Sequence, residues 1–100
     1  MDVNITRNEG ESKLALTGRL DTVTAPQLQE ELIPEFKDAD RVILDFAEIV
    51  YVSSAGLRVL LQAEKAAQAK GAEFRITGVC PEVMEVFEMT GFTGMLNIEE

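Results

Sequence analysis

Apolar and polar residues alternate along four short segments of the chain, which is the pattern of strands with one buried face. The expected strands cover Val3–Arg7, Lys13–Gly18, Arg41–Phe46 and Glu73–Thr77, with a shorter fifth one at Met95–Ile98. A turn that contains Gly10 separates the first two, and a glycine can adopt positive φ there without strain. We therefore expect these two strands to form a hairpin.

Three longer segments carry apolar residues at helical spacing. The first follows Thr24, which is expected to cap it, and has Pro26 in its first turn, where a missing N–H costs nothing. It should end or kink at Pro34. The second helix is expected at Ser54–Lys70 and the third at Pro81–Thr90, and a glycine directly follows each of them.

Together these elements predict an α/β fold, with residues 1–100 forming one domain around a four- to five-stranded mixed sheet. The strands alternate instead of being apolar throughout, so the helices should pack mainly on one face of the sheet. The strand–helix–strand order from Arg41 to Thr77 predicts a parallel pair joined by a right-handed crossover.

Composition removes several classes of function. The chain has 100 residues, a net charge of −9, no histidine and a single cysteine, Cys80. One cysteine excludes an internal disulfide and a cysteine-rich zinc site, and without histidine the usual general base is missing. An acidic chain is repelled by nucleic acids and by anionic membranes. No apolar run reaches the roughly 20 residues of a membrane helix.

These properties predict a soluble, cytoplasmic protein that is not an enzyme, with no cofactor, no metal and no direct contact with nucleic acid or membrane. Asp21 and Asp45 could in principle hold a metal ion, but no ligand motif at diagnostic spacing supports this. No glycine-rich phosphate loop is present either. The negative charge would suit a protein partner with a basic patch, but the simpler interpretation, that it serves only solubility, is favoured.

Two adjacent hydroxyls stand at the start of the second helix. If Ser53 caps the helix, Ser54 is its first residue and keeps a free hydroxyl, which the small Ala55 and Gly56 do not shield. Arg58 lies four residues after Ser54, on the same helix face, and Gln62 continues that face. In the simpler interpretation, both serines are local caps and Gly56 only permits close packing. Local spacing alone favours that interpretation.

Four segments of the chain resemble the STAS domain, which occurs in bacterial anti-sigma factor antagonists and in the tails of sulfate transporters. The signature of the family is similar to Val52–Leu61, and its Gly-x-Leu-Asp turn is similar to Leu16–Asp21. Its central strand is similar to Val42–Phe46, and its last helix to Pro81–Gly91. These segments follow one another in the order of the family and span nearly the whole chain.

The resemblance implies a phosphorylation switch. In the antagonists an anti-sigma factor with GHKL-type serine kinase activity modifies the first serine of an Asp-Ser-Ser-Gly pattern. Alignment on Gly56 places Ser54 at the acceptor position and Ser53 at the position of the aspartate. The alignment leaves Ser53 as a second candidate for the acceptor. The unphosphorylated protein would bind the anti-sigma factor and free the sigma factor, and a serine phosphatase would reverse the modification.

The resemblance also indicates a contact surface around this serine. The expected partner-binding residues are Asp21, Ala55, Gly56, Arg58 and Gln62, and the family's matching aspartate places Asp21 near the serine loop. Asp21 could equally be a plain turn residue, and Arg58 a solvated helix position. An alternative function with the same fold is that of a scaffold or adaptor subunit in a stress-signalling or transport complex.

Overall fold

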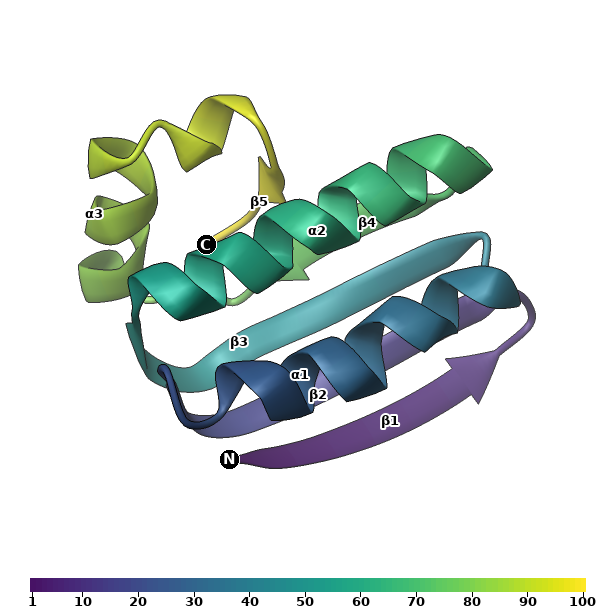
Figure 1. Ribbon diagram of the computed structural model, residues 1–100, viewed down its shortest axis with the longest axis horizontal. Helices are drawn as coiled ribbons and strands as arrows, with labels where there is room; N and C mark the ends of the chain where they lie inside the picture. Colours follow the sequence, from purple (N-terminus) through teal and green to yellow (C-terminus); the bar gives the residue numbers. More distant parts are fainter.

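The strands form one mixed sheet in which the spatial order is the same as the order along the chain, β1-β2-β3-β4-β5. The computed structural model, which describes residues 1–100, is shown in Figure 1. The strands are β1 (Asp2–Asn8), β2 (Glu11–Leu20), β3 (Arg41–Val52), β4 (Glu73–Thr77) and β5 (Asn97–Ile98). β1 and β2 form the predicted antiparallel hairpin, and β2, β3, β4 and β5 are parallel neighbours.

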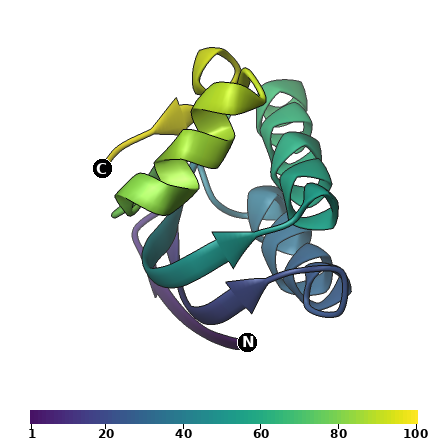
Figure 2. The same cartoon turned by 90° about the vertical axis from the view of Figure 1, so that its left-hand side faces the viewer.

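The helices confirm the predicted α/β fold. They are α1 (Ala25–Leu32), α2 (Ser54–Lys70) and α3 (Pro81–Met89), with short 3₁₀ turns η1 (Ile33–Lys37) and η2 (Phe92–Gly94). α1 and α2 lie side by side over one face of the sheet, and α3 lies at the end where β3 leads into α2 (Figures 1 and 2). No helix of the structure is both long enough and apolar enough to cross a membrane.

The core lies between the sheet and this helix layer. Leu14, Leu44 and Ile76 project from three neighbouring strands and are completely buried, as are Leu28 of α1 and Leu60 of α2. Their burial removes apolar surface from water, which is the main stabilising contribution to the fold.

The opposite face of the sheet carries charged residues paired across strands. Arg41 of β3 pairs with Glu11 of β2 at 3.5 Å and with Glu73 of β4 at 3.6 Å. Arg75 of β4 pairs with Glu73 and with Glu99, both at 3.0 Å. This face is therefore polar, as the strand alternation predicted.

Two strands are longer than predicted. β2 continues past Gly18, whose φ is 118°, and ends at Leu20, while β3 continues past Phe46 to Val52. The pairing of these strands shifts register beyond Asp45, and the Asp45 carboxylate accepts the backbone N–H of Ala47 at 2.9 Å. This irregularity interrupts the alternation of apolar residues, so the predicted strand ended at Phe46, although the following run Ile49–Val52 is strand-like as well.

Thr24 stands at the N-cap position of α1, as predicted, but its side chain does not cap the helix. Thr24 has helical backbone angles, and its hydroxyl makes no capping hydrogen bond. The hydroxyl donates to the carbonyl of Arg19 at 2.7 Å and accepts the backbone N–H of Asp21 at 2.9 Å. Thr24 therefore fastens the turn that precedes the helix. α1 ends before Pro34, as expected, and the chain continues as η1.

Candidate functional site

Ser53 stands at the junction between β3 and α2. Its backbone is extended (φ −93°, ψ 172°), and its side-chain oxygen accepts the backbone N–H of Gly56 at 3.4 Å. Its carbonyl accepts the N–H of Leu57 at 3.0 Å, which begins the hydrogen-bond ladder of the helix. Ser53 is therefore the N-cap of α2, and it is half-buried.

Ser54 is the first residue of α2 and differs from Ser53 in its exposure and in its hydrogen bonding. It is exposed, and its hydroxyl makes no hydrogen bond within the chain. It lies at the positive end of a 17-residue helix, where unpaired backbone N–H groups favour negative charge. Because Ala55 follows it, no large side chain of the first turn covers it. The free hydroxyl is chemically available to an approaching reagent or protein.

The start of α2 lies directly against the end of β2. The backbone N–H of Ser53 donates to the carbonyl of Leu20 at 2.8 Å. A Cβ atom at Gly56 would lie 2.6 Å from the Leu20 Cγ atom, closer than any side chain permits. Gly56 thus allows the helix to approach the strand, and because it is buried it presents no side chain to a partner.

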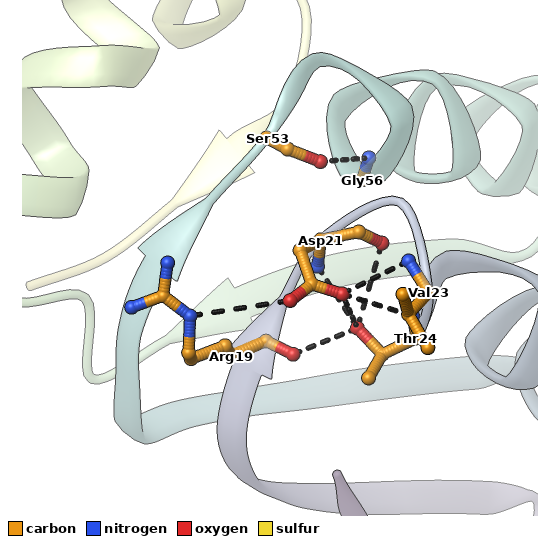
Figure 3. Close-up of polar contacts among 6 residues, drawn as sticks. All are labelled: Arg19, Asp21, Val23, Thr24, Ser53 and Gly56. Atoms are coloured by element: carbon orange, nitrogen blue, oxygen red, sulfur yellow. Dashed lines mark hydrogen bonds and ion pairs between the residues drawn. The ribbon is translucent and has the colours of Figure 1, made fainter.

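Asp21 follows Leu20 and builds the loop beside the serines (Figure 3). Its Oδ1 atom accepts the backbone N–H groups of Val23 and Thr24, both at 3.0 Å. The hydrogen bond from Thr24 is the main reason that the pKa of Asp21 is lowered from its ordinary value. Asp21 is therefore an ionised turn residue, and the close approach of Leu20 to Ser53 places it near the start of α2.

Several exposed side chains lie close to the junction between β3 and α2, and the sequence did not predict them. The Arg19 guanidinium stands 4.2 Å from the centre of the Tyr51 ring and 3.9 Å from the Asp21 carboxylate. Val23, in the loop that Asp21 holds, has 85% of its surface exposed, and Val50 has 66%. A clue in the sequence was the long apolar run before the serines, because a strand buried on one face cannot bury all of it.

A shallow groove of about 180 Å³ runs between α1 and α2. It gathers Ala55, Arg58 and Gln62 from the predicted set along one wall. Thr22, Pro26 and Gln29 form the other wall, and the sequence did not indicate them. The two walls could be assigned to one groove only once the packing of α1 against α2 was known.

The two aspartates considered as a metal pair are not brought together. Asp45 lies 4.0 Å from Lys13 on the open face of the sheet, before the register shift in β3. Asp21 belongs to the loop after β2, next to the far end of β3. The structure therefore gives no support to a joint role for these carboxylates.

Comparison with known proteins agrees with this geometry. The STAS domain family model matches residues 2–100. BtrV of Bordetella bronchiseptica, a candidate anti-sigma factor antagonist, is 33% identical over 99 residues, covering 98% of this chain and 85% of BtrV.

Solved structures share the fold at lower identity. An anti-sigma factor antagonist from Mycobacterium paratuberculosis superposes with a TM-score of 0.87 and 19% identity, covering 98% of this chain and 84% of that one. The Bacillus cell fate determinant SpoIIAA in its phosphorylated form gives a TM-score of 0.76 and 15% identity, covering 97% and 90%. The chain therefore belongs to the STAS domain family, among the anti-sigma factor antagonists.

Proposed function

We propose that the protein is a regulatory antagonist that binds an anti-sigma factor with GHKL-type serine kinase activity and is switched off by phosphorylation of Ser54. The observation that carries this proposal is the free hydroxyl of Ser54, exposed at the N-terminus of α2 beside a neighbour already used as the cap. Bound to the unphosphorylated protein, the anti-sigma factor would release its sigma factor.

Phosphorylation at this position is compatible with the fold. The Ser54 oxygen would attack the γ-phosphorus of ATP held by the kinase, with loss of the hydroxyl proton and departure of ADP. The phosphate adds about −1.5 to −2 charges at neutral pH. The N-terminus of α2 can stabilise this charge, since its first N–H groups lack helical acceptors. The domain should therefore stay folded after modification.

The same charge would disrupt a complex that packs on the junction. A charged, hydrated group brought into a protein interface without partners is costly to desolvate. The modified protein would therefore release the anti-sigma factor, and a serine phosphatase would restore binding by hydrolysing the phosphate ester. The SpoIIAA structure in a phosphorylated form supports the idea that this fold tolerates a phosphate.

Ser53 is the weaker acceptor in this proposal. Its oxygen already accepts the Gly56 N–H, and the residue is half-buried. Transfer to Ser53 would remove the cap of α2, which is worth about 1 kcal/mol. Transfer to Ser54 would break no hydrogen bond within the chain.

The proposal is tested with purified anti-sigma factors of the source organism and three variants, Ser54→Ala, Ser54→Asp and Ser53→Ala. Calorimetry should show that Ser54→Ala binds one anti-sigma factor as the unmodified protein does, whereas Ser54→Asp binds at least about tenfold more weakly, as expected for an uncompensated charge in an interface. After incubation with ATP, mass spectrometry should locate phosphate on Ser54 in the unmodified protein and in Ser53→Ala.

Two results would contradict the proposal. One is equal affinity of Ser54→Ala and Ser54→Asp for the anti-sigma factor. The other is the absence of binding to any anti-sigma factor, which would favour the alternative of a scaffold or adaptor subunit.

A further inference from the structure

Arg58 differs from every other arginine of the chain in having no carboxylate partner. The other four each pair with an acidic side chain within the 4.0 Å limit of an ion pair: Arg7, Arg19, Arg41 and Arg75. Arg58 is exposed on α2, and neither an ion pair nor a side-chain hydrogen bond engages it. In a chain with a net charge of −9, an arginine left without an acidic neighbour is conspicuous.

Four of the eight residues that line the groove between α1 and α2 carry hydrogen-bond donors in their side chains. Arg58 and Gln62 stand on the α2 wall, and Gln29 and the hydroxyl of Thr22 on the α1 wall. No aspartate or glutamate lines it. A guanidinium presents a planar fork that matches a carboxylate with two parallel hydrogen bonds, and amide groups can add further donors. The polar part of the lining therefore favours a carboxylate over a cation.

The size of the groove suits a single side chain of a protein partner better than a free small-molecule ligand. Its volume of about 180 Å³ is below the roughly 300 Å³ at which pockets for small-molecule ligands begin. Ala25 and Ala55 contribute to its lining and keep it open between larger residues. One acidic side chain that reaches in from a docked protein would fit, with its backbone remaining outside.

We propose that this groove receives an aspartate or glutamate side chain of the protein partner, held by Arg58 with the amides of Gln29 and Gln62. The inference rests on the proposed function, since the partner is the anti-sigma factor that contacts Ser54. Arg58 lies one helical turn beyond Ser54, where side chains of i and i+4 residues are neighbours. A protein that covers the Ser54 hydroxyl therefore reaches the mouth of the groove.

The test compares four variants in binding to the purified anti-sigma factor that the unmodified protein binds. Arg58→Glu reverses the charge in the groove, and Arg58→Lys keeps the charge but removes the planar fork. Gln29→Glu supplies a carboxylate from the opposite wall, which would occupy Arg58 internally. Lys65→Glu is the matched control, because Lys65 is another exposed cation of α2 without an ion pair and lies outside the groove.

Arg58→Glu should weaken binding about ten- to hundredfold, the range for a lost hydrogen-bonded charge. Arg58→Lys and Gln29→Glu should fall between it and the unmodified protein. Lys65→Glu should change affinity less than about fivefold, as expected for an exposed charge. One Asp→Arg or Glu→Arg substitution in the partner should restore binding to Arg58→Glu. Circular dichroism melting verifies that each variant is folded.

The outcomes separate this inference from the proposed function. Binding of Arg58→Glu at the affinity of the unmodified protein would overturn the groove contact while leaving the Ser54 switch intact. Equal weakening by Arg58→Glu and Lys65→Glu would show that only the overall charge of the protein matters for binding. That result would also overturn the groove contact. If the unmodified protein binds no anti-sigma factor, the proposed function fails and this inference fails with it.

Discussion

The two adjacent serines show how backbone geometry gives identical side chains different roles. Ser53 ends a strand in an extended conformation, so its hydroxyl reaches the N–H of Gly56. Ser54 already has helical geometry, and its hydroxyl is left to solvent. The preference of serine for helix N-termini made both residues candidate caps. The alignment with the family on Gly56 indicated Ser53 as the cap and Ser54 as the free hydroxyl. The close packing of Leu20 against Gly56, which leaves no room for a Cβ atom there, was not predictable, because it depends on how α2 packs against β2.

Substitution of Gly56 by alanine tests this packing. The added methyl group would overlap the side chain of Leu20, which is completely buried and has no room to move away. We expect Gly56→Ala to lower the free energy of unfolding by about 1–3 kcal/mol, the usual cost of overpacking. Urea denaturation measures the change. Gly94→Ala is the control, since no atom lies within 4 Å of its added Cβ, and an equal effect of both variants would contradict the explanation.

At the scale of elements, the sequence predicted which segments are strands and helices better than where they end. The α2 boundaries follow from the Ser53 cap and from Gly71, whose φ of 79° suits a helix C-terminus. The predicted third strand ended at Phe46, although the apolar run Ile49–Val52 is strand-like in the sequence, and β3 continues through this run after the register shift. A bulge of this kind depends on pairing with β2, which no local pattern shows.

The loop between β2 and α1 should respond to acid through Asp21. Hydrogen bonds from Thr24 and Val23 lower the pKa of Asp21, so the folded state holds the ionised form more strongly than the unfolded state does. Its contribution to stability is then complete above the unfolded aspartate pKa of about 3.9 and is lost as the pH falls through the lowered value.

Comparison of the unmodified protein with Asp21→Asn tests this linkage. Unfolding free energies measured between about pH 7 and pH 2 should show the unmodified protein to be the more stable one at neutral pH. The difference should shrink as the pH falls below about 4, because protonation makes the aspartate resemble the amide. A difference that is independent of pH would show that the ionised carboxylate of Asp21 does not stabilise the loop.

A second acidic residue joins three elements at the other end of the sheet. Glu35 of η1 accepts hydrogen bonds from Arg7 of β1 at 2.8 and 2.9 Å and from the buried hydroxyl of Ser12 in β2 at 2.8 Å. The hydrogen bond from Arg7 is the main reason that the pKa of Glu35 is lowered. No local pattern predicts this cluster, because its members come from separate segments of the chain.

Replacement of Glu35 by alanine should therefore destabilise the fold. Ser12 would keep a buried hydroxyl without its acceptor, which costs about 1–3 kcal/mol of stability. The exposed Arg7 guanidinium would be hydrated instead, so the loss of its ion pair should cost little. Guanidinium denaturation of Glu35→Ala measures this cost. The double variant Glu35→Ala, Ser12→Ala should recover part of it, and a double variant less stable than the single one would contradict the role of the Ser12 hydroxyl.

At the scale of the whole molecule, the proposed contact surface lies on the outer side of the helix layer that covers the core. The core lies between the helices and one face of the sheet, whereas Ser54 is exposed at the start of α2 and the groove opens between α1 and α2. A partner can therefore bind or leave without disturbing the core. This arrangement agrees with the proposed function, in which other proteins distinguish the phosphorylated from the unphosphorylated form while the fold itself stays unchanged.

The two faces of the sheet should contribute very differently to the free energy of unfolding. Two positions of β3 on opposite faces provide the comparison. Leu44 is completely buried under the helices, whereas the Arg41 side chain is 52% exposed on the open face despite its ion pairs. Leu44→Ala should cost about 2–5 kcal/mol, a large share of the 5–15 kcal/mol typical of a domain. Arg41→Ala should cost less than about 1 kcal/mol.

Chemical denaturation of both variants at several protein concentrations checks this prediction. If Arg41→Ala were as costly as Leu44→Ala, the charged face could not be solvated in the isolated protein. A cost that grows with protein concentration would then indicate that a second copy covers the sheet. A small cost that is independent of concentration would leave the helix-covered face as the only core, and the start of α2 as the surface available for regulated contacts.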